Sequence, residues 1–198
     1  CAAMADLSSE TSRTGAGDRR ARFGRAHPSD FSVSIRIPFN RVTLTGNELA
    51  YIHQAVERGH LSGDGGFTRR CHELLQKEVG VPRALLTTNC THALEMAALL
   101  LELEPGDEVI VPSFAFVTTV NAFVLHGATP VFADVRADTL NLDERALAGL
   151  VTPRTRAVVP LHYAGVACEL DPILALAKEH GLTVVEDNAH GLFARYKG

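Results

Sequence analysis

Cys90 and Thr91 stand where a short apolar run, residues 84–88, gives way to a helix-forming series at residues 93–103. The first N–H groups of a helix have no partner inside the helix, so a strand that leads straight into a helix offers phosphate a binding place. The sequence contains neither GxGxxG nor GxxxxGK[ST], the two common phosphate motifs. A phosphate site without them favours a phosphorylated cofactor such as pyridoxal phosphate; the alternative is that Thr91 simply caps the helix.

Asp187 directly follows a short segment, residues 183–186, that contains Val184 and Val185 and is predicted to be a strand. A partly buried carboxylate at that place would keep a basic ring nitrogen protonated, or it would cap the next turn. The residue types of Phe116 and His190 alone indicate a core aromatic and a surface histidine.

The elements that must position these residues follow a regular pattern. Helices are predicted at residues 46–58 and 68–79. Strands at residues 84–88, 108–111, 130–134, 157–161 and 183–186 then alternate with helices at 91–103, 115–126, 143–150 and 171–180. The strands are continuous apolar runs, which is typical of a sheet covered on both faces. The fold class predicted is therefore α/β, with a mostly parallel sheet and helices on both faces.

Ligands of such sheets bind at the carboxyl ends of the strands. That rule predicts one crevice for the residues that follow the strands. These are residues 88–91, residues 113–116, Asp134, His162, Tyr163 and residues 187–190.

Composition excludes several classes of protein. The net charge is −4 over 198 residues, which gives no electrostatic case for nucleic acid, and no apolar run approaches the length of a membrane span. The four cysteines, Cys1, Cys71, Cys90 and Cys168, are widely spaced without a CxxC pair, so we expect reduced thiols, a cytoplasmic location and no metal site.

Residues 1–36 differ in composition from the rest and are predicted to be a disordered extension, because they are rich in Ser, Gly, Ala and Arg without apolar periodicity.

From residue 37 onward the sequence resembles the DegT/DnrJ/EryC1/StrS family of sugar aminotransferases. Five stretches carry the resemblance in one collinear run: residues 62–68, 87–97, 105–114, 160–169 and 185–191. The segments GDGGFTRRC, residues 63–71, and HYAGVACE, residues 162–169, are most similar to the group that forms dTDP-4-amino-4,6-dideoxygalactose. The resemblance implies an aspartate-aminotransferase-like fold, pyridoxal-phosphate fold type I. It also implies that residues 37–198 are the N-terminal part of the large domain of such an aminotransferase, truncated at its C-terminus.

The resemblance also implies roles for five residues around pyridoxal 5′-phosphate. Cys90 and Thr91 would hold its phosphate through the helix N-terminus, and Phe116 would stack on its ring. Asp187 would pair with the protonated ring nitrogen. The family usually has glutamine at position 190 against the ring hydroxyl, and alanine at 188, where this sequence has His190 and Asn188.

The activity implied is transfer of an amino group from glutamate to a dTDP-4-keto-6-deoxyhexose by a homodimer. The lysine that binds the cofactor covalently in this family matches none of Lys77, Lys178 and Lys197, so we expect the chain alone to be inactive. Alternatives are a sugar dehydratase on the same scaffold and a non-catalytic truncated product. A nicotinamide dehydrogenase is disfavoured, because no glycine fingerprint is present.

Overall fold

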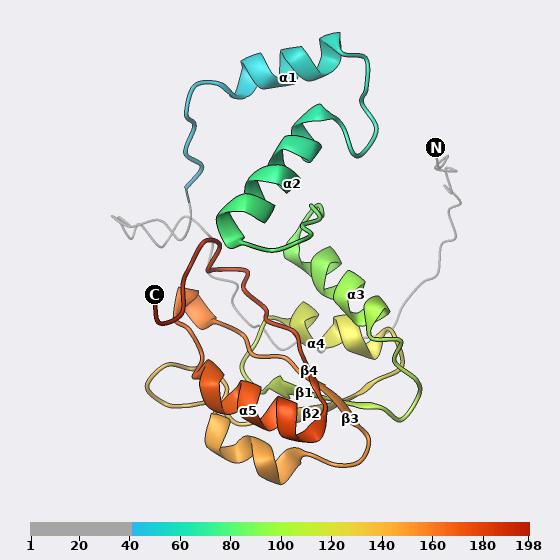
Figure 1. Cartoon of the computed structure of the whole chain (residues 1–198), viewed down its shortest axis with the longest axis vertical. Coiled ribbons are helices and arrows are strands. Elements are labelled where there is room, and N and C mark those ends of the chain that lie inside the picture. The colour runs from blue at the N-terminus through green and yellow to red at the C-terminus, as the bar shows by residue number, and fades with distance from the viewer. Residues whose placement is uncertain (1–40) are drawn as a thin grey trace, which may run out of the picture. The chain divides into compact units, whose positions relative to one another are not determined.

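The computed structural model describes residues 41–198, so the predicted extension at residues 1–36 lies outside the described part. Residues 47–198 form one compact unit. Its centre is a four-stranded sheet (Figure 1) of β1 (Glu108–Pro112), β2 (Thr129–Ala133), β3 (Thr155–Val158) and β4 (Thr183–Val184). The strand order is β2-β1-β3-β4, and every pair is parallel. The predicted fold class is thus confirmed.

Three helices precede the first strand, and the others connect the strands. Their bounds are α1 (Glu48–Glu57), α2 (Gly66–Val79), α3 (Cys90–Leu100), α4 (Val117–Val124) and α5 (Leu170–His180), with short 3-10 helices η2 (Glu144–Leu150) and η3 (Tyr163–Gly165). Left-handed glycines end α2 and α5, Gly80 at φ 75° and Gly181 at φ 65°.

Alternate residues of the central strands point to opposite faces of the sheet, and each face has its own core. Val109 and Val111 pack in a cluster with Leu94 of α3 and Phe123 of α4. Ile110 packs in the other cluster with residues of η2 and α5, among them Leu147 and Ile173. Because both faces are covered, the strands contain no polar alternation, as the sequence indicated.

One of the predicted elements is wrong. Residues 84–88 form no strand, because a strand needs a hydrogen-bonded neighbour and no described segment pairs with them; Leu85 is accordingly 66% exposed. The short helix predicted at residues 143–150 is present as the 3-10 helix Glu144–Leu150.

No helix in the described residues has the length and apolar character needed to cross a membrane. Residues 41–198 also contain no group of three His, Cys, Asp or Glu side chains placed to hold a metal ion.

Candidate cofactor site

Asp187 lies at the carboxyl edge of the sheet, three residues after Val184, the last residue of β4. Its backbone continues the parallel pairing with β3, since its N–H donates to the carbonyl of Pro160 at 2.9 Å and it bridges Leu161. The residue is 3% exposed. A carboxylate in this place is nearly removed from water, so its hydrogen-bond partners decide whether its charge is tolerated.

All of its hydrogen-bond donors within the described residues are neutral. The hydroxyl of Thr119 donates to Oδ2 at 2.7 Å, and the thiol of Cys90 donates to Oδ1 at 3.6 Å. The backbone N–H of Ala189 also donates to Oδ1, at 3.3 Å, which is the local turn expected as the alternative role of Asp187. A buried carboxylate that meets only neutral donors is suited to a cationic partner supplied by a ligand.

The N-terminus of α3 lies beside Asp187, and its first backbone N–H groups have no acceptor inside the helix. Asn89 caps the helix, because its side-chain oxygen accepts the N–H of His92 at 2.9 Å. Thr91 is therefore not the cap, and its hydroxyl donates instead to the hydroxyl of Thr118 at 3.1 Å. The N–H groups of Cys90 and Thr91 are in the first turn, where the helix offers them no acceptor, so they are suited to bind an anion.

Cys90 joins the two halves of this arrangement. Its backbone is at the helix N-terminus while its sulfur is directed at Asp187. Desolvation of the thiol, the negative charge of Asp187 and the hydrogen bond to that carboxylate all raise the pKa of Cys90 above 9.0. The thiol consequently stays protonated near neutral pH and serves as a donor.

Phe116 precedes α4 and is 70% exposed, so it is not the core aromatic that its residue type suggests. Its ring makes no aromatic contact within residues 41–198. The neighbouring Phe114 packs on Tyr163 with ring centroids 4.8 Å apart, and Tyr163 in turn meets the edge of His190 at 6.2 Å. The phenyl ring of Phe116 is thus free to cover a flat ligand.

His190 is exposed, yet its ring is held in place. Its Nδ1 accepts the backbone N–H of Ala164 at 3.2 Å, which leaves Nε2 as the protonated nitrogen of a neutral ring. Ala164 belongs to η3, a turn with two successive left-handed residues, Ala164 at φ 53° and Gly165 at φ 82°.

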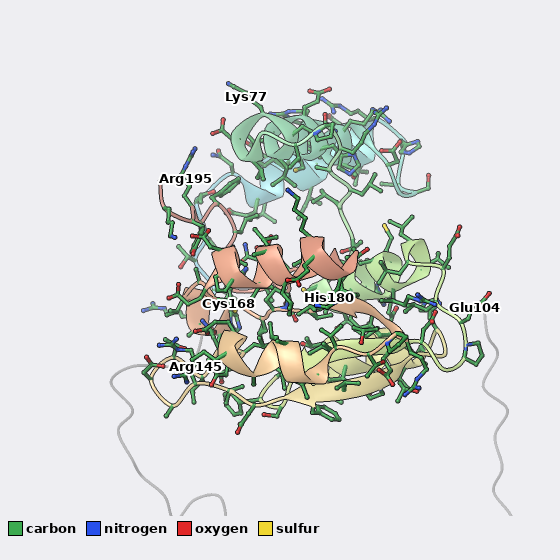
Figure 2. The ribbon with its side chains drawn as sticks, turned by 60° about the horizontal axis from the view of Figure 1, so that its bottom comes forward. Lys77, Glu104, Arg145, Cys168, His180 and Arg195 are labelled. Atoms are coloured by element: carbon green, nitrogen blue, oxygen red, sulfur yellow. The ribbon has the colours of Figure 1, made fainter. Side chains whose placement is uncertain are left out.

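A second ionisable pair, His162 and Glu186, lies directly behind Asp187. Nε2 of the buried His162 and Oε2 of Glu186 are 2.8 Å apart. Contact with Cys168 and the Glu186 carboxylate raise the pKa of His162 to about 9, and the hydrogen bond from His162 lowers the pKa of Glu186. The backbone N–H of Cys168 also donates to Nδ1 of His162, at 3.1 Å, and a protonated ring would have to release that bond. Cys168 lies under α5 (Figure 2) and is buried.

None of the three lysines, all within the described residues, forms an ion pair or hydrogen bond with Asp187. Lys77 is exposed on α2 (Figure 2), and Lys197 forms an ion pair with Asp171. Lys178 is in the last turn of α5, just before β4 begins, and so belongs to the opposite edge of the sheet.

The structure brings together part of the predicted crevice. Cys90 and Asp187, 97 positions apart, are in contact, and Thr91 and Phe116 belong to helix N-termini joined by the Thr91–Thr118 bond. Asp134 shares no hydrogen bond with these residues; its carboxylate accepts the N–H of the next residue, Val135, at 2.8 Å.

Sequence reasoning missed Thr118, Thr119 and Glu186, and it placed Asn89 in the crevice without recognising it as the helix cap. A polar residue in the first turn of a helix that follows a strand is the signal that points to Thr118 and Thr119. Asn89 could have been recognised as the preferred cap type directly before the helix.

Residues 42–198 match the sequence profile of the DegT/DnrJ/EryC1/StrS aminotransferase family. The chain belongs to this family. Members of the DegT family are aminotransferases, and the fold implied by the sequence resemblance is confirmed by solved relatives.

Three relatives illustrate the similarity. The spore coat polysaccharide biosynthesis protein SpsC of Bacillus subtilis is 40% identical over 161 residues, which cover 81% of this chain and 41% of SpsC. GDP-perosamine synthase of Caulobacter vibrioides is 39% identical over 163 residues, covering 82% and 44%. The solved PLP form of the sugar aminotransferase Spr1654 of Streptococcus pneumoniae gives a TM-score of 0.74 at 29% identity, covering 82% and 45%.

This chain therefore spans less than half the length of each of these DegT-family relatives. Spr1654 has been solved with the cofactor as PLP and as PMP, the pyridoxal and pyridoxamine phosphates. The open N-terminus of α3 and the buried Asp187 with neutral donors fit the two charged ends of such a cofactor, the phosphate and the ring nitrogen.

Proposed function

We propose that this chain is the cofactor-binding part of a pyridoxal-phosphate-dependent sugar-nucleotide aminotransferase. The observation that carries the proposal is the Asp187 carboxylate, which is almost fully buried, meets only neutral donors among the described residues, and lies in contact with the first residue of α3. A helix N-terminus suited to bind an anion is thus adjacent to a negatively charged carboxylate. This arrangement suits a ligand that has phosphate at one end and a protonated nitrogen at the other.

Each predicted residue has a role in this proposal. The N–H groups of Cys90 and Thr91 bind the phosphate, and the exposed ring of Phe116 covers the pyridine. Asp187 holds a proton on the ring nitrogen, and Nε2–H of His190 donates to the ring oxygen. When bound, the cofactor supplies the electron sink and carries the amino group from donor to ketone.

The substrates we propose are glutamate as amino donor and a dTDP-4-keto-6-deoxyhexose as acceptor. The support is the similarity of residues 63–71 and 162–169 to the enzymes that form dTDP-4-amino-4,6-dideoxygalactose. GDP-perosamine synthase, as its name states, makes a GDP-linked product, so the nucleotide is the feature to test first. The free thiols of Cys71, Cys90 and Cys168 support a reducing compartment, the cytoplasm.

A homodimer is also proposed. Large apolar side chains of α3 and at the end of α4 reach the surface, including Leu100 of α3 at 76% and Leu125, directly after α4, at 71% exposure. Exposed apolar side chains on neighbouring helices are typical of a surface that another chain segment or subunit covers.

The cofactor assignment is tested by titrating the purified chain with pyridoxamine phosphate, which cannot form random bonds with surface lysines. We expect binding in the wild type, and clearly weaker binding in Asp187→Asn, because the neutral amide no longer favours a protonated ring nitrogen. Asp134→Asn removes an equal charge from a neighbouring part of the sheet edge and should bind as the wild type does. Equal binding by wild type and Asp187→Asn would contradict the assignment.

The reaction is tested on a protein that joins this chain to a family segment containing the lysine that binds the cofactor covalently. Glutamate and a dTDP-linked 4-keto-6-deoxyhexose should yield 2-oxoglutarate and the amino sugar, and the GDP-linked ketone should react more slowly. Loss of water from the sugar without transfer of nitrogen would instead indicate the dehydratase. No reaction on either ketone would favour a non-catalytic role.

A further inference from the structure

Three donors from different parts of the chain fix the Asp187 carboxylate, and they are not equal. The hydroxyl of Thr119 lies 2.7 Å from Oδ2, whereas the thiol of Cys90 and the N–H of Ala189 lie 3.6 Å and 3.3 Å from Oδ1. Short O–H···O⁻ bonds are about twice as strong as bonds between neutral groups. Thr119 is therefore the principal partner of Asp187 within the described residues.

Thr119 is itself held firmly. It is 0% exposed, and its backbone N–H donates to the carbonyl of Phe116 at 3.0 Å in the first turn of α4. Threonine is branched at Cβ, and its side chain is stiff in a helix. The hydroxyl is thus aimed at Oδ2 by the helix, and its orientation does not depend on a ligand.

We propose that Thr119 is a positioning residue, which fixes the rotation of the Asp187 carboxylate so that Oδ1 stays turned toward Cys90 at the N-terminus of α3. The use of that carboxylate for the cofactor ring rests on the proposed function. The contact between Thr119 and Asp187 does not, and it can be tested without cofactor.

The reactivity of Cys90 reports this orientation, because its thiol donates to Oδ1, the carboxylate oxygen that Thr119 does not bind. Without the Thr119 hydroxyl, the carboxylate either rotates away or takes up a proton. Both changes remove negative charge and an acceptor from the sulfur. The Cys90 thiol should then ionise more readily and react faster with an alkylating reagent.

The experiment follows alkylation of each cysteine by iodoacetamide at one neutral pH, with peptide mass spectrometry as the readout. A fall of one unit in the thiol pKa raises the thiolate tenfold and lowers its intrinsic reactivity about threefold, so Thr119→Val should speed Cys90 alkylation by about threefold. Thr119→Ser, which restores the hydroxyl, should return the rate to that of the wild type. Asp187→Asn gives the upper limit.

The chain offers matched controls. Thr118→Val removes a hydroxyl from the same turn, one that meets Thr91 instead of Asp187, and should leave the Cys90 rate unchanged. Cys71 is exposed, so its alkylation rate measures the activity of the reagent. Cys168 is buried, so its alkylation indicates unfolding. Cys168 should remain protected in every variant.

A Cys90 rate in Thr119→Val equal to or below that of the wild type overturns the proposal, as does failure of Thr119→Ser to restore the rate. If Thr119→Val exposes Cys168, the variant is unfolded, and the proposal is then tested by NMR measurement of hydroxyl-proton exchange in the wild type. A Thr119 hydroxyl proton that exchanges slowly supports the proposal, and one that exchanges freely overturns it. Absence of pyridoxamine phosphate binding by the wild type would count against the proposed function alone.

Discussion

At the scale of single residues, the position of one proton on His190 determines what the histidine can offer a ligand. The N–H of Ala164 donates to Nδ1 at 3.2 Å, so the proton of the neutral ring is on Nε2. The chain thereby keeps a hydrogen-bond donor at the position where its family usually has glutamine. The substitution changes the side chain and retains the donor.

This assignment predicts the tautomer in solution. Two-dimensional NMR of the chain with ¹⁵N-labelled histidine, at a pH where the ring is neutral, should show His190 protonated at Nε2 and bare at Nδ1. His126, which makes no side-chain hydrogen bond among the described residues, serves as the internal reference for a free mixture of tautomers. A His190 spectrum equal to that of His126 would show that the Ala164 contact does not hold in solution.

At the scale of elements, the turn η3 brings His190 to the sheet edge and requires a glycine. Gly165 has φ 82°, and a Cβ at this position would meet the carbonyl oxygen of His190 at 3.3 Å. Gly165→Ala should cost about 1–2 kcal/mol of unfolding free energy, because a non-glycine residue is disfavoured in the left-handed region. Urea unfolding measures this loss.

Gly149→Ala is the matched control, since a Cβ there meets nothing within 4 Å and the backbone has no positive φ. Its stability should equal that of the wild type or rise slightly. Equal stability of the two alanine variants would mean that η3 relaxes freely and does not position His190.

The pair of Glu186 and His162 joins the end of β4 to the loop after β3, and it should make stability dependent on pH. The hydrogen bond from His162 holds the pKa of Glu186 below its ordinary value of 4.5. A lowered folded-state pKa stabilises the protein above pH 4.5, and this contribution is lost as the pH falls through the folded-state pKa.

We therefore expect Glu186→Gln to lower the unfolding free energy at pH 6 and to have a smaller effect at pH 3, as measured by urea unfolding at a series of pH values. Glu179→Gln removes the same charge from an exposed place on α5 and should show no such difference. A Glu186→Gln effect that is as large at pH 3 as at pH 6 would contradict the role of the ion pair.

At the scale of the whole molecule, the chain gathers the groups for a cofactor and no lysine beside them within its described residues. Lys77 is exposed on α2, Lys178 is at the opposite sheet edge, and Lys197 is paired with Asp171. Treatment with pyridoxal phosphate and borohydride should therefore label none of the three stoichiometrically, as peptide mapping will show. Full labelling of one lysine, suppressed by pyridoxamine phosphate, would show that it reaches the site.

The sequence by itself determined the class of fold and part of the candidate site, because continuous apolar strands, glycine-ended helices and polar strand ends are local patterns. The parallel sheet and the position of Asp187 at its edge follow from such patterns, whereas Cys90 and Thr91 were expected there on the basis of a strand at residues 84–88 that does not form. Residues 84–88 show their limit, because an apolar run becomes a strand only if another strand pairs with it.

Only the tertiary structure decided which side chains meet. Asp187 touches Cys90 and Thr119, which are 97 and 68 positions away, and no local pattern specifies a partner at that distance. The exposure of Phe116 was also decided there, since an aromatic ring is core or surface according to which elements pack over it. The physical reason is that burial and hydrogen bonding belong to pairs of elements, and the packing of α3 and α4 on the sheet brings these pairs together.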